Sequence, residues 1–117
     1  MKRKVYLFCS FGMSTSLLAD KMQKVADEHN LPIEVEAFPI AEIDKIVEEK
    51  NPDCILLGPQ VKYMLKELKP KFEAQGKLID IINEVDYGTM NGEKVLKLAI
   101  KLIKSKQARI IVKNNRK

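Results

Sequence analysis

The stretch VYLFCSFGMSTSLL (residues 5–18) decides the fold of this chain. Its first five residues are an apolar run that ends in a cysteine, and such a run is typical of a strand buried on both faces of a parallel sheet. Small and hydroxyl-bearing residues follow as a loop, and a helical pattern begins at about residue 16. A strand, a short loop and a helix in this order predict one unit of an α/β fold.

Three further runs predict strands. Residues 54–57 are again continuous and apolar, and residues 78–82 are similar apart from Asp80, whereas residues 33–37 alternate as in a half-exposed edge strand. Helical patterns are expected at about residues 16–29, 41–50, 61–68 and 93–106, with the third ending at Pro70. The sequence therefore predicts an α/β fold in one domain, with a four-stranded parallel sheet in βαβαβαβα order and helices on both faces.

Length and composition limit the class of protein. A chain of 117 residues is about one domain long, and its 21 Lys and Arg against 16 Asp and Glu give a net charge of +5 on a mixed surface. This mixture argues against nucleic-acid binding. Because no apolar segment reaches the ~18 residues of a membrane span, we expect a cytoplasmic protein whose cysteines are reduced. No His, Cys and carboxylate cluster has metal-ligand spacing, so neither a metal nor a cofactor is expected.

The last predicted helix has a solvated face and a basic end. Its lysines fall opposite its apolar residues, at positions 94, 97, 101 and 104. We expect the domain to span residues 1–106 and residues 107–117 to form a basic tail, which is either disordered or a short added strand.

Cys9 is the candidate for chemistry, because it closes the first strand at the sheet edge where parallel α/β proteins bind ligands. The next helix presents unpaired amides and the positive end of its dipole, and residues 10–15 can form a nest for a phosphate. The same field favours the thiolate form, so a nucleophile and an anion site coincide. Cys54 begins its strand at the opposite edge, which argues against a disulfide.

Four separated segments carry a recognisable pattern: CSFGMSTS (9–16), EAFP (36–39), LLGPQ (56–60) and YGTMNG (87–92). Together they resemble the enzyme IIB component of the bacterial sugar phosphotransferase system, lactose/cellobiose/chitobiose class. The resemblance extends from about Lys4 to Lys106 and implies a four-stranded parallel sheet flanked by helices.

The resemblance also implies a function. Cys9 would accept phosphate from a histidine of the IIA component and pass it to a sugar of the β-glucoside, cellobiose or chitobiose class, bound in the IIC membrane component. The phosphate cradle would be Ser10, Phe11, Gly12, Met13, Ser14, Thr15 and Ser16. Walls of the site or contacts to partners would be Gly58, Pro59, Gln60 and Tyr87, which follow strands on the same edge. Phe11 and Met13 are expected at the exposed tip of the loop.

Three other interpretations stay open. Cys9 can be a small apolar residue at a strand end, with the hydroxyls capping a helix. A cysteine loop also occurs in low-molecular-weight tyrosine phosphatases, but the arginine that they place six positions after the cysteine is Thr15 here; Asp86, in a loop at the same edge, would be the general acid. A regulatory module would bind an anion in the same loop without forming a covalent adduct.

Overall fold

Four strands form one parallel sheet. A computed structural model of the chain describes residues 2–10 and 12–115, without the side chains of residues 12–14 and 107–115. The strands are β1 (Arg3–Cys9), β2 (Ile33–Pro39), β3 (Cys54–Leu57) and β4 (Leu78–Ile81), in the order β2-β1-β3-β4. All neighbouring strands are parallel, so their carboxyl ends share one edge. The four predicted strands are confirmed, and β2 lies at an edge of the sheet, as its alternation predicts.

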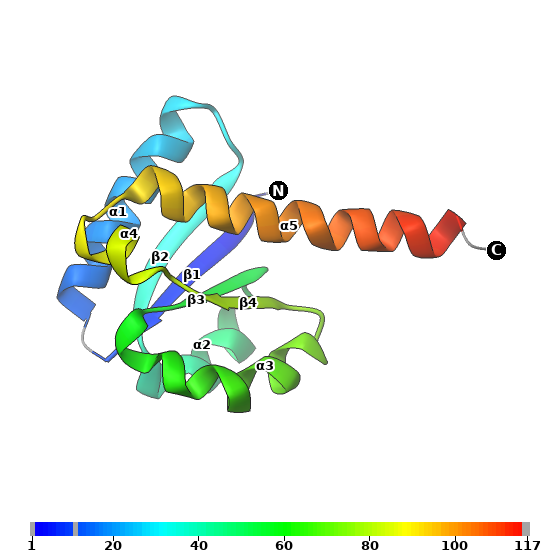
Figure 1. Cartoon of the computed structure of the whole chain (residues 1–117), viewed down its shortest axis with the longest axis horizontal. Coiled ribbons are helices and arrows are strands. Elements are labelled where there is room, and N and C mark those ends of the chain that lie inside the picture. Colours follow the sequence, from blue (N-terminus) through cyan, green and yellow to red (C-terminus); the bar gives the residue numbers. More distant parts are fainter. Residues whose placement is uncertain (1, 11, 116–117) are drawn as a thin grey trace.

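Helices cover both faces of the sheet (Figure 1). One face carries α1 (Gly12–Glu28) and α5 (Gly92–Asn115), with α4 (Glu84–Gly88) beside α1. The other face carries α2 (Ile43–Lys50) and α3 (Leu65–Glu73), which follow the short 3-10 helices η1 (Ile40–Glu42) and η2 (Pro59–Met64). The predicted helix–sheet–helix architecture is therefore correct.

Strand β1 lies between the two helical layers. Val5 and Leu7 pack with residues of α1 and α5, whereas Tyr6 and Phe8 pack with residues of α2 and α3. Each of these four side chains is at most 1% exposed. Because successive side chains of a strand alternate between its faces, burial on both sides requires the continuous apolar run that the sequence shows.

The helix boundaries differ from those predicted. Helix α1 begins at Gly12 rather than near residue 16, so most of the predicted loop is the first turn of a helix. Helix α3 passes through Pro70 and ends at Glu73. Burial of Phe72, which is 1% exposed, holds this last turn against the sheet despite the backbone hydrogen bond that a proline removes.

Two differences lie towards the end of the chain. The short helix α4 was missed because five residues are too few to show a helical period. Helix α5 continues to Asn115, so residues 107–115 are neither the disordered tail nor the added strand that was expected. The four lysines of its predicted polar face, Lys94, Lys97, Lys101 and Lys104, are exposed. The division into a domain and a tail at residue 106 stays a prediction.

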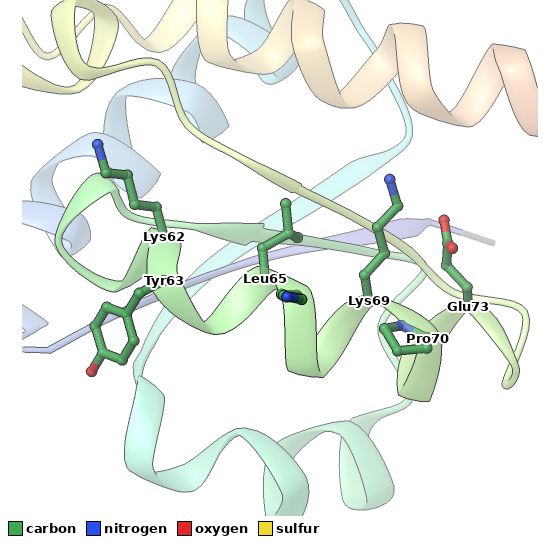
Figure 2. A pocket seen from close by; sticks show the side chains of 7 residues that line it. Lys62, Tyr63, Leu65, Lys69, Pro70 and Glu73 are labelled. Atoms are coloured by element: carbon green, nitrogen blue, oxygen red, sulfur yellow. The ribbon is translucent and has the colours of Figure 1, made fainter.

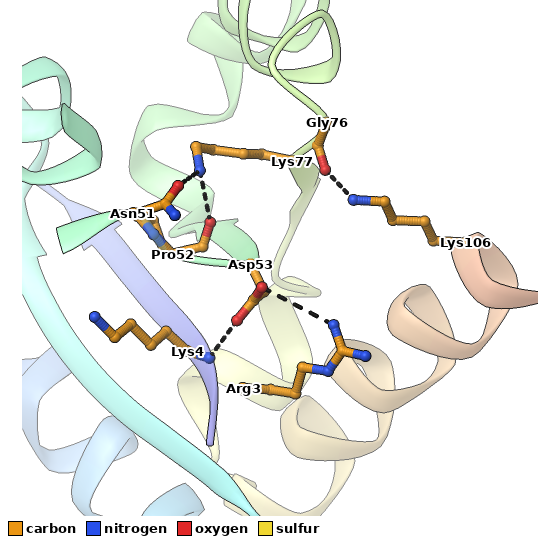
Figure 3. A network of polar contacts seen from close by, with 8 residues as sticks. All are labelled: Arg3, Lys4, Asn51, Pro52, Asp53, Gly76, Lys77 and Lys106. Atoms are coloured by element: carbon orange, nitrogen blue, oxygen red, sulfur yellow. Dashed lines mark hydrogen bonds and ion pairs between the residues drawn. The ribbon is translucent and has the colours of Figure 1, made fainter. Parts of the chain in front are cut away.

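A polar network closes the sheet edge opposite Cys9 (Figure 3). The Lys77 ammonium donates to the Asn51 side chain and, at 3.1 Å, to the Pro52 carbonyl oxygen. The Asp53 carboxylate accepts the Lys4 amide at 2.8 Å and lies 4.0 Å from Arg3. Burial lowers the pKa of Lys77, and Asp53 partly opposes this effect. This edge is therefore stabilised by contacts within the chain.

Candidate functional site

Cys9 is the last residue of β1, and α1 begins three residues later. Its side chain is 1% exposed. The first amides of a helix have no partners inside the helix and carry the positive end of its dipole. The structure thus has Cys9 at the carboxyl end of β1, shortly before the N-terminus of α1, and the anion site at this position stays a prediction.

The predicted cradle, residues 10–16, divides into three parts. Ser10 is exposed, and Phe11 lies outside the described residues. Gly12, Met13 and Ser14 form the first turn of α1, and their side chains lie outside the description, as does the predicted exposure of Phe11 and Met13. Thr15 is buried and Ser16 is exposed on the helix. Most of the segment that was predicted as a free loop is therefore the first turn of a helix, and its role as a phosphate cradle stays a prediction.

Gly58 lies against Cys9. Its amide donates to the Phe8 carbonyl oxygen at 2.8 Å, which continues the β1–β3 pairing past the end of β3. A Cβ at this position would lie 3.2 Å from the Cys9 Cβ and 2.8 Å from the Gln60 Oε1. The glycine therefore allows β3 to approach the cysteine closely, with the Gln60 side chain folded back over the same turn.

Pro59 and Gln60 start the helical segment after that turn. Pro59 is the first residue of η2 and is half-buried, which suits its fixed backbone angle. Gln60 is exposed. Gly58, Pro59 and Gln60 were all predicted to lie at the site. Among them, Gly58 approaches Cys9 closely.

Tyr87 belongs to α4 and is bonded to the cradle segment. Its hydroxyl lies 3.0 Å from the Thr15 Oγ1 in a buried hydrogen bond. Asp86, expected in a loop, is likewise part of α4. The sequence predicted both Tyr87 and Thr15 but not their pairing. The local sequence carries a start signal for α4, because Asn83 accepts the amides of Val85 and Asp86 as a helix cap, but it carries none for the pairing of Tyr87 with Thr15.

Cys54 is the first residue of β3 and is fully buried. Burial, followed by the carboxylates of Asp80 and Asp53, raises the pKa of its thiol to about 12. Both cysteines are among the described residues, and no disulfide joins them. Cys54 therefore stays a protonated, apolar part of the core, as expected.

A hollow of about 580 Å³ lies elsewhere, along the outer side of η2 and α3 (Figure 2). It is lined by Lys62, Tyr63, Leu65, Lys66, Lys69, Pro70 and Glu73. None of these residues was predicted to belong to the site. Figure 2 shows this lining along η2 and α3, and Cys9 is not among the residues that form it.

Residues 2–10 and 12–115 contain neither a membrane-spanning helix nor a metal-binding cluster. No helix in this part of the chain is long and apolar enough to cross a membrane. Within the same residues, no three His, Cys, Asp or Glu side chains are grouped so that they could hold a metal ion.

Comparison with known proteins identifies the family. The family described as "PTS system, Lactose/Cellobiose specific IIB subunit" matches residues 4–98. The chain belongs to this family. It is therefore a IIB component of a sugar phosphotransferase system, and the resemblance in the four sequence segments is confirmed.

Individual relatives agree with this assignment. The IIB chain is 44% identical over 102 residues to the galactose-specific EIIB component of Lactococcus lactis subsp. cremoris, strain MG1363, covering 85% of this chain and 94% of the relative. It is 43% identical to the cellobiose-specific EIIB component of Lactococcus lactis subsp. lactis, strain IL1403, with the same coverage. The solution structure of the cellobiose-specific IIB component of Borrelia burgdorferi superposes with a TM-score of 0.73 at 39% identity, covering 91% of this chain and 95% of that one.

Proposed function

We propose that Cys9 is the residue on which this IIB component carries the phosphoryl group. The observation that carries the proposal is the position of the thiol at the carboxyl end of β1, beside the N-terminus of α1 and the close turn at Gly58. Helix amides stabilise negative charge on both the thiolate and the phosphoryl oxygens. Ser10 and the residues of the first turn of α1 form the proposed cradle.

Two transfers make up the proposed reaction. In the first, the Cys9 sulfur attacks the phosphorus of a phosphohistidine on the IIA component; an S–P bond forms, the N–P bond breaks, and the imidazole leaves. In the second, a sugar hydroxyl oxygen in the IIC component attacks the same phosphorus. The S–P bond breaks, the thiolate is restored, and the hydroxyl proton passes to a base of the acceptor.

The site favours a carrier over a phosphatase. Arginine provides phosphatases with a bidentate clamp for the transition state, whereas position 15 here is a buried threonine. Arg3, the arginine whose side chain the structure describes, begins β1 at the other edge and lies beside Asp53. Weak stabilisation of the hydrolytic transition state suits a phosphocysteine that must persist until its acceptor binds.

The proposed partners are a IIA component as donor and a IIC membrane component as acceptor, and the proposed location is the cytoplasmic side of the membrane. A sugar of the β-glucoside, cellobiose or chitobiose class is the proposed substrate. The cellobiose-specific relative supports this class, and the galactose-specific relative supplies the competing sugar for a test. No cofactor is required by the two transfers.

The test follows the phosphoryl group through both transfers. The chain is incubated with phosphoenolpyruvate, the upstream phosphotransferase proteins and a matching IIA, and then with IIC membranes and either cellobiose or galactose. We expect one phosphoryl group per chain, discharged when cellobiose is present. Turnover of an aryl phosphate without a stable adduct would instead indicate a phosphatase, and tight phosphate binding without an adduct would indicate an anion-binding module.

A further inference from the structure

We propose that Tyr87 is a positioning residue for phosphoryl transfer, acting through its hydrogen bond to Thr15 at the start of α1. The role assigned to Tyr87 depends on the role proposed for Cys9. Tyr87 comes from α4, which follows β4, and β4 is separated from β1 in the sheet by β3. The bond therefore joins the cysteine segment to a distant part of the chain.

The contact is buried and specific. The two oxygens are 3.0 Å apart, Thr15 is fully buried and Tyr87 is 9% exposed. In such surroundings a hydroxyl without a partner costs free energy, so each residue holds the other in place. The Tyr87 ring also packs in the core cluster that contains Leu18 and Met22 of α1. The phenol is thus anchored by its ring and directed at Thr15 by its hydroxyl.

The side-chain rotamer of Thr15 is what this bond can control. A threonine in a helix divides between two χ1 rotamers, because its hydroxyl can bond to the carbonyl three or four residues earlier. For Thr15 those positions are 11 and 12, directly after Cys9 and Ser10. By engaging Oγ1, Tyr87 restricts the rotamers of Thr15 in the first turns of the helix that begins at the proposed anion cradle.

The support for Tyr87 is itself rigid. Asn83 caps α4 by accepting two amides, and its carbonyl accepts the Tyr87 amide at 2.9 Å. Five residues after Tyr87, Gly92 lies so close to α1 that a Cβ there would be 2.9 Å from the Lys21 carbonyl carbon. The segment from Asn83 to Gly92 is therefore held against α1 at two points, one of which is the Tyr87–Thr15 bond.

The test compares Tyr87→Phe with a matched loss of a hydroxyl. Tyr6→Phe is the control, because the Tyr6 hydroxyl donates to Glu34 at 3.1 Å and its ring packs on the opposite face of the sheet. Single-turnover transfer from phosphorylated IIA gives the maximal rate and the half-saturating IIA concentration. The ³¹P chemical shift of the phosphorylated chain reports on the environment of the phosphoryl group.

We expect Tyr87→Phe to lower the maximal rate about 3- to 10-fold, because the loss of one buried hydrogen bond to Thr15 loosens the start of α1 beside the reacting group. The half-saturating IIA concentration stays within about twofold of the wild-type value, and the ³¹P chemical shift differs from that of the wild-type chain. Thr15→Val produces the same loss, Thr15→Ser restores most of the rate, and the Thr15→Val/Tyr87→Phe double variant is no slower than the slower single variant.

The outcomes separate the two proposals. A wild-type rate and ³¹P shift in Tyr87→Phe, or an equal loss in Tyr6→Phe, would overturn the positioning role and leave Cys9 as the carrier. Absence of any phosphoryl group on Cys9 of the wild-type chain would overturn both proposals.

Discussion

Cys9 and Cys54 are buried cysteines on β1 and β3, which are neighbours in the sheet. Cys9 ends β1 and Cys54 begins β3, so the two residues lie at opposite ends of the parallel strands. Cys54 is paired with Val5, four residues before Cys9, so about 13 Å of strand separates the two positions. Helix amides and a close glycine turn lie beside Cys9. For Cys54, burial raises the pKa of the thiol, and the nearby carboxylates of Asp80 and Asp53 raise it further.

This difference lies in the surroundings of the two thiols and not in their burial. Both side chains are at most 1% exposed. A parallel sheet has helix N-termini after the carboxyl ends of its strands, so of the two cysteines Cys9 lies at the edge where the first amides of a helix are available to an anion. At the other edge, Lys77 donates to Asn51 and the Lys4 amide donates to Asp53. These contacts hold the loops that lead into the strands (Figure 3).

The largest expected effect is the loss of phosphorylation in Cys9→Ser. A serine hydroxyl is a weaker nucleophile that stays protonated, so phosphoryl uptake from IIA should fall to background while the fold is kept. Cys54→Ala is the matched control and should take up one phosphoryl group per chain. Uptake is measured by intact mass, and folding by thermal unfolding. Phosphorylation that persists in Cys9→Ser but disappears in Cys54→Ala would show that Cys54, and not Cys9, carries the phosphoryl group.

A second change crowds the edge at Cys9. In Gly58→Val the Cβ would meet the Cys9 Cβ at 3.2 Å, and the two added methyl groups would increase the overlap. We expect a loss of about 1–3 kcal/mol in the free energy of unfolding. Transfer to Cys9 should be about 10-fold slower, because the thiol is displaced from the helix amides.

Gly88→Ala provides the control for this change. A Cβ at Gly88 has no atom within 4 Å, and alanine is the better helix former at this position in α4. Urea unfolding and the transfer rate are measured for both variants. Equal transfer rates in Gly58→Val and Gly88→Ala would show that the turn at Gly58 does not position Cys9.

The smallest effect concerns Cys54 at high pH. The pKa of this thiol is about 12 in the folded chain against an ordinary value of 9.0. Between these values the unfolded chain has lost the proton and the folded chain keeps it, so stability falls as pH rises, by about 1.4 kcal/mol per pH unit from this group. Urea unfolding from pH 8 to 10 should show a steeper decline for wild type than for Cys54→Ala. Equal slopes would contradict the inferred environment of Cys54.

Strands were predictable from the sequence because burial on two faces imposes a continuous apolar run, as in Val5–Phe8, and burial on one face imposes alternation, as in Ile33–Ala37. Helix ends were less predictable. Residues 12–15 include hydroxyl-bearing side chains that suit a loop as well as a first helical turn, and Pro70 normally marks an end. In both places tertiary packing, of buried Thr15 and of Phe72, extends the helix.

The candidate site was predictable in part for a similar reason. The position of Cys9 follows from strand order, since the end of a strand and the start of the next helix are adjacent in the chain. The contacts of Gly58 with Cys9 and of Tyr87 with Thr15 join residues 49 and 72 positions apart. Such contacts depend on the order β2-β1-β3-β4 and on the path of the chain through α4, neither of which a local pattern contains.

The most direct test of the account is to locate the phosphoryl group by peptide mass spectrometry after phosphorylation through IIA, under conditions that preserve phosphocysteine. The account predicts one modified peptide, which contains Cys9, and an unmodified peptide that contains Cys54. A phosphoryl group on Cys54, or on any other residue with Cys9 unmodified, would contradict it.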